Sequence, residues 1–254
     1  MARLRSLVFN ALWLVFTVVM TTATALALPF PARCAQSVAA AWSRGTGWLL
    51  RLVCGIRVEV RGREHLPTDA CIVACKHQSA WETVVFLHLL PWAVYTPKIE
   101  LIRLPIFGRC LRKIGHIGID RKAGARALRD LVEGSRAALA LGRQVVVFPE
   151  GRRVAVGHDS KYHAGIAALY SQCDARVVPV ALNSGCSWAR NAFVKHPGTI
   201  VIEFLEAIEP GRDKREFLEL LRERIESRTD LLVAEARAAP GQPASTQSSP
   251  RRSS

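Results

Sequence analysis

Apolar positions are most concentrated near the N-terminus, where residues 7–28 (LVFNALWLVFTVVMTTATALAL) contain no charged side chain. At about 1.5 Å of rise per residue, a helix of this length would extend about 30 Å, roughly the thickness of a bilayer core. The pattern predicts a membrane anchor that is retained. A cleaved signal peptide is the alternative, because basic residues precede the run and an A-x-A sequence ends at Ala27.

The next segment, residues 33–54, mixes Trp and Leu with Arg. This mixture is typical of a helix lying in the membrane interface, with tryptophan at headgroup level and arginine reaching toward water. An amphipathic core helix fits the same segment equally well. We therefore predict a membrane anchor and an interfacial helix over residues 1–55. Their orientation is left open, because basic residues flank the anchor on both sides.

From residue 57 onward, short β-rich runs alternate with longer helical patterns. Candidate strands cover 57–62, 70–75, 92–97, 114–120, 144–149, 176–182 and 199–208, and candidate helices cover 78–90, 122–141, 160–172 and 213–237. The alternation predicts one α/β domain over residues 56–237, with helices flanking a central, mostly parallel or mixed sheet. Residues 238–254 are rich in Ser and Pro without apolar periodicity, which predicts a disordered tail.

The charge balance favours an anionic partner. The chain carries 35 Lys and Arg against 21 Asp and Glu, a net charge of +14, which suits nucleic acid, an acidic membrane or a phosphorylated substrate. The seven cysteines form no C-x-x-C pair and have no His at zinc-finger spacing. We therefore expect neither a disulfide framework nor a structural zinc site, and scattered free thiols are typical of a reducing compartment.

Polar clusters follow three of the candidate strands. The sequence KHQS occupies 76–79, DRK occupies 120–122 and PEGRR occupies 149–153. In open α/β sheets, ligands bind at the carboxyl ends of the strands. We therefore expect the three clusters to share one crevice.

The spacing of His77 and Glu82 restricts where the two side chains can meet. Five residues of helix turn through about 500°, which leaves the side chains about 140° apart. They can meet only if His77 precedes the helix and Glu82 lies in its first turns, with Ser79 as a possible N-cap. A carboxylate beside one imidazole nitrogen prepares the other to accept a proton from a hydroxyl. The alternative is a capping turn in which the His and Glu are incidental.

Two arginines that follow candidate strands are the predicted anion-binding groups. Arg121 and Arg153 could each grip a phosphate bidentately, and Gly151 would let the backbone approach an anion closely. No Walker motif, G-x-G-x-x-G or G-x-S-x-G is present. A base without a nucleophile indicates direct attack by a substrate hydroxyl.

Together these motifs resemble the four ordered blocks of the lysophosphatidic acid acyltransferase family, the PlsC-type glycerolipid acyltransferases. Residues 77–82 resemble H-x4-D, with Glu82 in place of Asp. Residues 118–121 (GIDR) resemble the second block, 148–153 (FPEGRR) resemble F-P-E-G-T-R with Arg in place of Thr, and 178–181 (VPVA) resemble the fourth.

The resemblance implies a specific reaction. His77 would deprotonate the sn-2 hydroxyl of 1-acyl-sn-glycerol-3-phosphate, and Glu82 would orient His77. The hydroxyl would then attack the thioester of acyl carrier protein or coenzyme A, giving phosphatidic acid without a cofactor, a metal or a covalent enzyme intermediate. Because these donors are made in the cytosol, the resemblance places the catalytic domain on the cytoplasmic face of the inner membrane.

The resemblance also implies which residues contact the acceptor phosphate. Arg121 and Arg153 would bind it, Lys98 would assist, and Glu150 and Gly151 would shape the loop beside it. The expected partners are lysophosphatidic acid and anionic membrane lipid, and no nucleic acid. Two alternatives stay open: an acceptor such as lyso-ornithine lipid, and a basic membrane-surface protein without catalysis.

Overall fold

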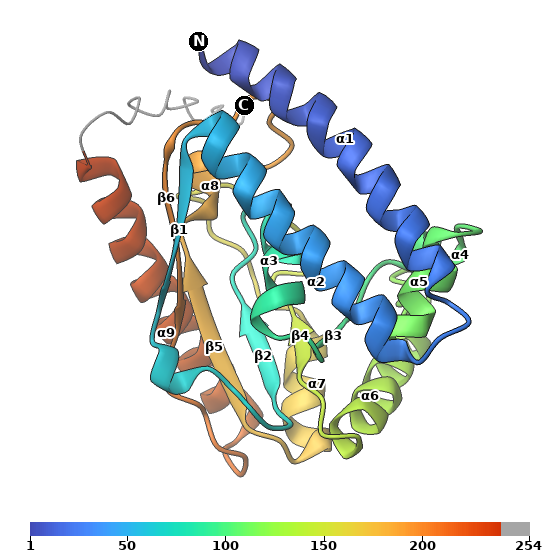
Figure 1. The fold of residues 1–254 in the computed structure, drawn as a ribbon. Coiled ribbons are helices and arrows are strands. Elements are labelled where there is room, and N and C mark those ends of the chain that lie inside the picture. The colour runs from blue at the N-terminus through green and yellow to red at the C-terminus, as the bar shows by residue number, and fades with distance from the viewer. Residues whose placement is uncertain (240–254) are drawn as a thin grey trace, which may run out of the picture.

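The computed structural model describes residues 1–239 of the chain. At its centre is a six-stranded sheet in the order β1-β6-β5-β2-β4-β3 (Figure 1). Its strands are β1 (Ile56–Arg61), β2 (Ile72–Cys75), β3 (Val94–Tyr95), β4 (Val145–Val147), β5 (Val177–Leu182) and β6 (Gly198–Phe204). Four neighbouring pairs are parallel and the β5–β6 pair is antiparallel, so the prediction of a mixed α/β sheet is confirmed.

Helices cover both faces of the sheet (Figure 1). They are α1 (Ala2–Leu26), α2 (Ala32–Leu49, continued by a π turn at Leu50–Cys54), α3 (Glu82–Leu89), α4 (Ile99–Arg103), α5 (Phe107–Ile114), α6 (Ala125–Ala140), α7 (Ala164–Cys173), α8 (Ser184–Ser187) and α9 (Lys214–Ala238), with a 3-10 turn at Arg63–His65. Side chains from α1, α3 and the π turn pack on one face, and side chains from α6, α7 and α9 pack on the other.

The central strand β2 shows why the strand sequences are almost continuously apolar. Val73 and Cys75 face the core beneath α1 and α3, whereas Ile72 and Ala74 face the core beneath α6, α7 and α9. All four side chains are fully buried. A strand covered on both faces needs apolar residues at every position, and this explains the run that precedes the 76–79 cluster.

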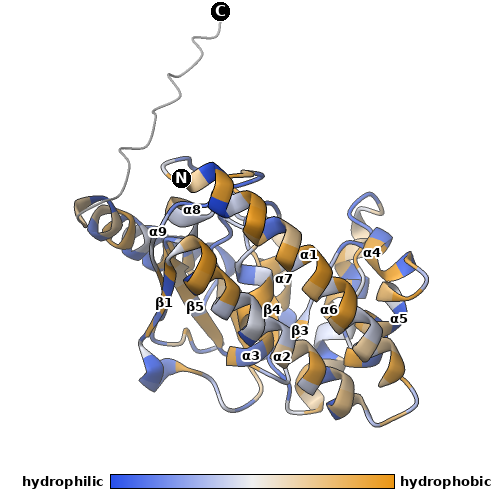
Figure 2. Cartoon of the chain, turned by 45° about the horizontal axis from the view of Figure 1, so that its top comes forward, coloured by the Kyte–Doolittle hydropathy of each residue, from blue (hydrophilic) through white to orange (hydrophobic). Residues whose placement is uncertain are grey.

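The N-terminal apolar segment forms α1, which is long and apolar enough to cross a membrane. Phe9 on its inner side is fully buried and packs edge-on against Trp188, with ring centroids 5.7 Å apart. Most of its other apolar side chains are exposed, and Figure 2 shows α1 as a largely hydrophobic rod along the molecular surface. The helix α2 is more polar and packs along α1 and α3, where the Ser43 hydroxyl donates to the carbonyl of Val84.

The predicted strand over 114–120 was wrong. Residue 114 ends α5, Gly115 adopts a left-handed conformation, and the chain then continues as a loop. Only Ile119 forms a β-bridge, with Lys98: its N–H donates to the Pro97 carbonyl at 2.9 Å, and its carbonyl accepts from Ile99 N–H at 3.0 Å. A single bridge aligns the two segments but is too short to count as a strand.

Several other boundaries also differ from the sequence prediction. The helix predicted at 78–90 begins at residue 82, because the Glu82 carboxylate binds the N–H groups of Gln78 and Ser79 and holds them in a turn. Ser79 does not cap the helix; its hydroxyl accepts from Trp81 N–H. The strand predicted at 199–208 ends at Phe204, and the short helices α4, α5 and α8 were not predicted. From residue 240, the predicted tail lies outside the described residues.

Candidate active site

His77 lies where the sequence spacing requires, between the end of β2 and the start of α3. Because β2, β4 and β5 are parallel, their carboxyl ends meet at one edge of the sheet. The imidazole stacks on Phe148, which follows β4, with ring centroids 4.0 Å apart. The carbonyl of His77 accepts from Val154 N–H at 2.8 Å. Within the predicted clusters, the N–H of His77 donates to the Glu150 carboxylate at 2.8 Å, so the clusters at 76–79 and 149–153 are in direct contact.

Glu82 is fully buried, and the surrounding loop supplies several hydrogen bonds to its carboxylate. The N–H of Gln78 donates to Oε1 at 2.9 Å, the N–H of Ser79 donates to both oxygens at 2.9 and 3.0 Å, and the Ser184 hydroxyl donates to Oε1. These donors fix the position of the carboxylate in the loop. Ser184, at the start of α8, was missed by the sequence reasoning.

The Glu82 carboxylate also faces the ring of His77. Oε2 lies 3.7 Å from Nδ1, and Nδ1 has no hydrogen-bond partner among the described residues. At this distance the two groups interact through charge more than through a hydrogen bond. An Nδ1–H directed at the carboxylate leaves Nε2 with a free lone pair, which is the arrangement of a general base.

Glu150 points into the protein rather than toward solvent. Its Oε2 accepts from the main-chain N–H of His77 at 2.8 Å, and its Oε1 lies 2.7 Å from Nζ of Lys76. Burial raises the pKa of the Glu150 carboxyl, and the Lys76 ammonium and the His77 N–H act in the opposite direction. Glu150 thus holds the main chain of His77 in place. The ion pair with Lys76 was not predicted.

The basic residues of the predicted phosphate site gather around the loop that follows β4. A guanidinium nitrogen of Arg121 donates to the carbonyl of Gly151, which joins the loop after α5 to the 149–153 cluster. Arg153 is half-buried and has no hydrogen bond or ion pair within residues 1–239. Lys98 is exposed at the start of α4. It pairs with Ile119 in the β-bridge, and Arg121 follows Ile119 by two residues.

Gly151 has φ of 61°, in the left-handed region, and a Cβ at this position would lie 2.6 Å from Cδ2 of His163. The close approach that glycine permits is therefore to the His163 ring, while the Gly151 carbonyl meets Arg121. A larger residue would displace the loop that carries Arg153.

No cluster of three or more His, Cys, Asp and Glu side chains within residues 1–239 could hold a metal ion. All seven cysteines are free, and burial raises the pKa of the Cys75 thiol well above its usual value, which keeps this neighbour of Lys76 protonated.

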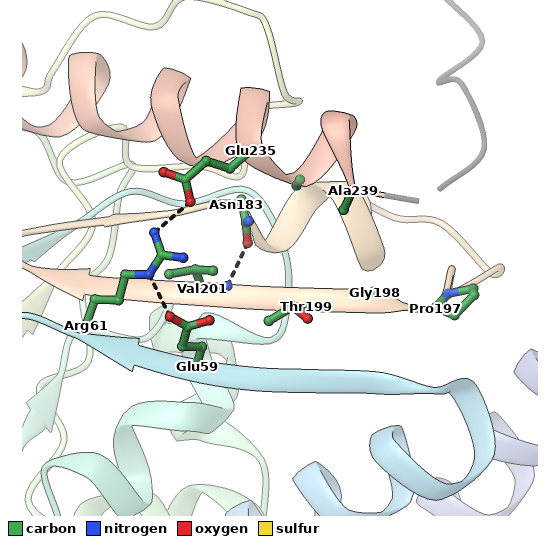
Figure 3. Close-up of a pocket in the computed structure, with 10 residues that line it drawn as sticks. Glu59, Arg61, Asn183, Pro197, Gly198, Thr199, Val201, Glu235 and Ala239 are labelled. Atoms are coloured by element: carbon green, nitrogen blue, oxygen red, sulfur yellow. Dashed lines mark hydrogen bonds and ion pairs between the residues drawn. The ribbon is translucent and has the colours of Figure 1, made fainter. Parts of the chain in front are cut away.

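A surface pocket of about 540 Å³ lies between β1, β6 and α9, apart from His77 (Figure 3). Inside it, Arg61 Nε lies 2.7 Å from Glu59, and Arg61 Nη1 lies 2.6 Å from Glu235. None of the predicted site residues lines this pocket. Its charged side chains satisfy one another, so we do not assign it the chemistry.

The fold and site define a class of enzyme in which a histidine base and its carboxylate stand at the carboxyl ends of parallel strands, beside basic residues. Residues 57–183 match the family model described as Acyltransferase. The chain therefore belongs to the acyltransferase family and is an enzyme of acyl transfer.

Relatives and a solved structure agree with this assignment. The 1-acyl-sn-glycerol-3-phosphate acyltransferase of Pseudomonas aeruginosa is 39% identical over 175 residues, covering 69% of this chain and 68% of the relative. That of Cocos nucifera is 27% identical over 199 residues, covering 77% and 64%. The crystal structure of the 1-acyl-sn-glycerophosphate acyltransferase PlsC from Thermotoga maritima has the same fold, with a TM-score of 0.76 at 18% identity, over 92% of this chain and 98% of that one.

Proposed function

We propose that this protein transfers a fatty acyl group from an acyl thioester to the sn-2 hydroxyl of 1-acyl-sn-glycerol-3-phosphate, giving phosphatidic acid. The observation that carries the proposal is the His77 ring, held between Phe148 and the Glu82 carboxylate, next to the loop whose Gly151 carbonyl accepts from Arg121. Several relatives bear the name of this activity, including one of 39% identity, which supports the same acceptor here.

In the proposed mechanism, Nε2 of His77 removes the proton of the acceptor hydroxyl as its oxygen attacks the thioester carbonyl. The imidazolium that forms lies 3.7 Å from the Glu82 carboxylate, which stabilises its positive charge. The tetrahedral intermediate then collapses, the carbon–sulfur bond breaks, and the imidazolium returns its proton to the leaving thiolate. The products are an ester and a free thiol, and His77 is neutral again.

The basic side chains around the 149–153 loop supply the proposed phosphate site. Arg153 has guanidinium donors that no described residue uses, so they remain available to phosphate oxygens. Arg121, held by the Gly151 carbonyl, and Lys98, across the β-bridge, add positive charge on the same side. In this arrangement Glu150 and Gly151 shape the loop and do not contact the phosphate.

We propose that α1 anchors the catalytic domain to the cytoplasmic face of the inner membrane. Its apolar side chains are largely exposed, for example Leu14 at 64% and Val18 at 58%. A second exposed apolar group lies on α4, α5 and the turn between them, near the end of α1 (Figure 1), and comprises Leu101, Leu104, Ile106 and Phe107. Exposed apolar surface of this kind marks a membrane or protein contact, and membrane contact would bring a lipid acceptor to His77.

Turnover by the purified full-length protein tests the proposal. Lysophosphatidic acid and lyso-ornithine lipid are offered as acceptors, each with acyl carrier protein and coenzyme A thioesters, and the product is identified by mass spectrometry. We expect phosphatidic acid to form with at least one donor. Faster acylation of the phosphate-free acceptor would overturn the choice of substrate.

The matched variant is His77→Ala. We expect it to lose acylation while it still sediments with membranes, because the proposed anchor lies in α1. Retention of activity would refute the role of His77, and binding without turnover by the unmodified protein would instead favour a non-catalytic membrane protein.

A further inference from the structure

Lys76 is a buried cation directly beside the proposed base. Only 3% of its side chain is exposed, and it lies between the apolar end of β2 and His77. Burying an ammonium group is costly unless carboxylates surround it. A lysine at this position of the loop therefore requires carboxylate partners, which an apolar residue would not.

Two carboxylates from distant parts of the chain hold the Lys76 ammonium. Nζ lies 2.7 Å from Oε1 of Glu150, and 2.8 and 2.7 Å from the two oxygens of Glu226 on α9. Burial alone would lower the pKa of Lys76, but Glu150 and Glu226 more than offset it and raise that pKa. The ammonium is therefore charged and uses its three donors on these two residues.

The two carboxylates have different surroundings. Glu150 is fully buried and uses its second oxygen to accept the main-chain N–H of His77 at 2.8 Å. Glu226 is 21% exposed, and its Oε1 also accepts the Tyr162 hydroxyl at 3.0 Å. One continuous path of hydrogen bonds thus runs from α9 to the backbone of the proposed base.

This path gives the buried Lys76 ammonium a role, because it links Glu226 on α9 to the carboxylate that holds the main chain of His77. Two backbone hydrogen bonds hold the loop between β2 and α3: Lys76 N–H donates to the Val180 carbonyl at 3.0 Å, and the His77 carbonyl accepts from Val154 N–H at 2.8 Å. Side-chain carboxylates bind the N–H groups of the three residues that follow Lys76. Glu82 holds the N–H groups of Gln78 and Ser79, and Glu150 holds the N–H of His77. Without Lys76, Glu150 would lose its cation, and without Glu226 the ammonium would lose the anchor that α9 provides.

We propose that Glu226 on α9 is a positioning residue: through Lys76 and Glu150 it holds the His77 backbone so that the ring remains between Phe148 and Glu82. The residue lies outside the segment 57–183 that matches the family model, and it contacts neither the base nor its carboxylate. The proposal rests on the proposed role of His77 as general base.

The test is Glu226→Gln, which keeps the size of the side chain and removes its charge. We expect kcat to fall at least fivefold, while KM for acceptor and donor stays within twofold, because substrate contacts are unchanged. In the Lys76→Met background the same substitution is expected to have no further effect on kcat, because the path is already broken. Additive losses in the double variant would overturn the proposal.

The matched control is Glu203→Gln. Glu203 on β6 also pairs with α9, through Arg228 Nε at 2.8 Å, and its side chain is 14% exposed, but it does not touch Lys76. We expect this variant to lose thermal stability to a similar degree and to keep its kcat. If Glu226→Gln keeps its kcat too, or if both variants lose kcat equally, Glu226 has only a structural role.

A readout without turnover separates this proposal from the proposed reaction. In the isotope-labelled protein in detergent, the main-chain amide proton of His77 should shift upfield and exchange faster in Glu226→Gln, and keep its native values in Glu203→Gln. An unmoved His77 amide refutes the positioning even if the enzyme is active. A moved amide supports it even if lysophosphatidic acid proves not to be the acceptor. If Glu226→Gln does not fold, Glu226→Asp is expected to give the same changes, smaller in size.

Discussion

Replacement of Glu82 by Gln tests whether its charge acts on the proposed base. The substitution keeps an oxygen that can accept the loop N–H groups, but it removes the charge 3.7 Å from His77 Nδ1. At an effective dielectric constant of about 20, a carboxylate and an imidazolium at this separation attract by about 4 kcal/mol. Since 1.36 kcal/mol corresponds to a factor of ten, kcat should fall about a thousandfold. The amide would also donate to Nδ1 and favour the wrong tautomer.

The matched variant is Glu82→Asp, which keeps the charge and places at this position the aspartate of the H-x4-D block. Shortening the side chain by one C–C bond, about 1.5 Å, widens the gap to about 5 Å if the loop does not move. The attraction then falls by about 1 kcal/mol, so kcat should fall about tenfold. A larger loss in Asp than in Gln would show that side-chain length, and not charge, is what the site needs.

The assay is steady-state acylation with saturating donor and acceptor, together with thermal unfolding of each variant. KM should change little, because Glu82 is fully buried and cannot reach substrate. If Glu82→Gln keeps more than a tenth of the normal kcat but unfolds at a lower temperature, the carboxylate only holds the Gln78 and Ser79 amides. The electrostatic role would then be refuted.

Three further predictions follow from other contacts. Arg153→Gln should raise KM for lysophosphatidic acid by tenfold or more, the value of about one charge-assisted hydrogen bond, while KM for the donor is unchanged; an equal rise in both would contradict phosphate binding. Ser184→Ala removes one of the hydrogen bonds to Glu82 and should lower kcat less than tenfold, which initial rates can measure. Burial, with a smaller contribution from Arg143, lowers the pKa of His116 from 6.5 to about 3, and its Nδ1 accepts from Tyr95 N–H. Neutral His116 therefore stabilises the fold above about pH 6.5, and this stability is lost as the pH falls. Between pH 8 and 5 the free energy of unfolding, measured with denaturant, should fall by about 2 kcal/mol more in the unchanged protein than in His116→Asn. Equal losses in the two proteins would contradict this.

The sequence predicts the sheet better than its connections. Each strand of the sheet begins within two residues of the start of a candidate strand. In β2, β4 and β5 this is because a strand buried on both faces must be apolar throughout, whereas β1 is recognised by its alternation of apolar and polar residues. The segment 114–120 was misassigned because its apolar residues, such as Ile114 and Ile117, serve a helix end and a loop. The segment is as apolar as a strand, so its composition does not separate a strand from a loop. Its backbone pairing does: the segment forms a single β-bridge, between Ile119 and Lys98, instead of a ladder.

In the site, too, the sequence predicts what depends on neighbouring residues and does not predict what depends on residues far along the chain. The spacing of His77 and Glu82 required the histidine to precede the helix, which is a property of helix geometry and can be read from five residues. The same spacing does not report that Nδ1 and Oε2 stay 3.7 Å apart, because that distance depends on Ser184 and the loop amides. For this pair the sequence predicts that the two residues meet, and the packing of other elements sets how closely they meet.

Glu226 is the extreme case of a contact that no local pattern reveals. It lies 150 positions after Lys76, on a helix whose charged residues resemble an ordinary solvated face. A signal was available in the sequence: a lysine directly after a strand buried on both faces must find a carboxylate, because an unpaired ammonium is not tolerated there. Glu150, at the end of the neighbouring parallel strand, could be inferred as one partner. Lys76 has three donors, however, and the second carboxylate had to come from an element packed over the same edge. The need for that partner was predictable, but its identity depends on how α9 crosses the sheet.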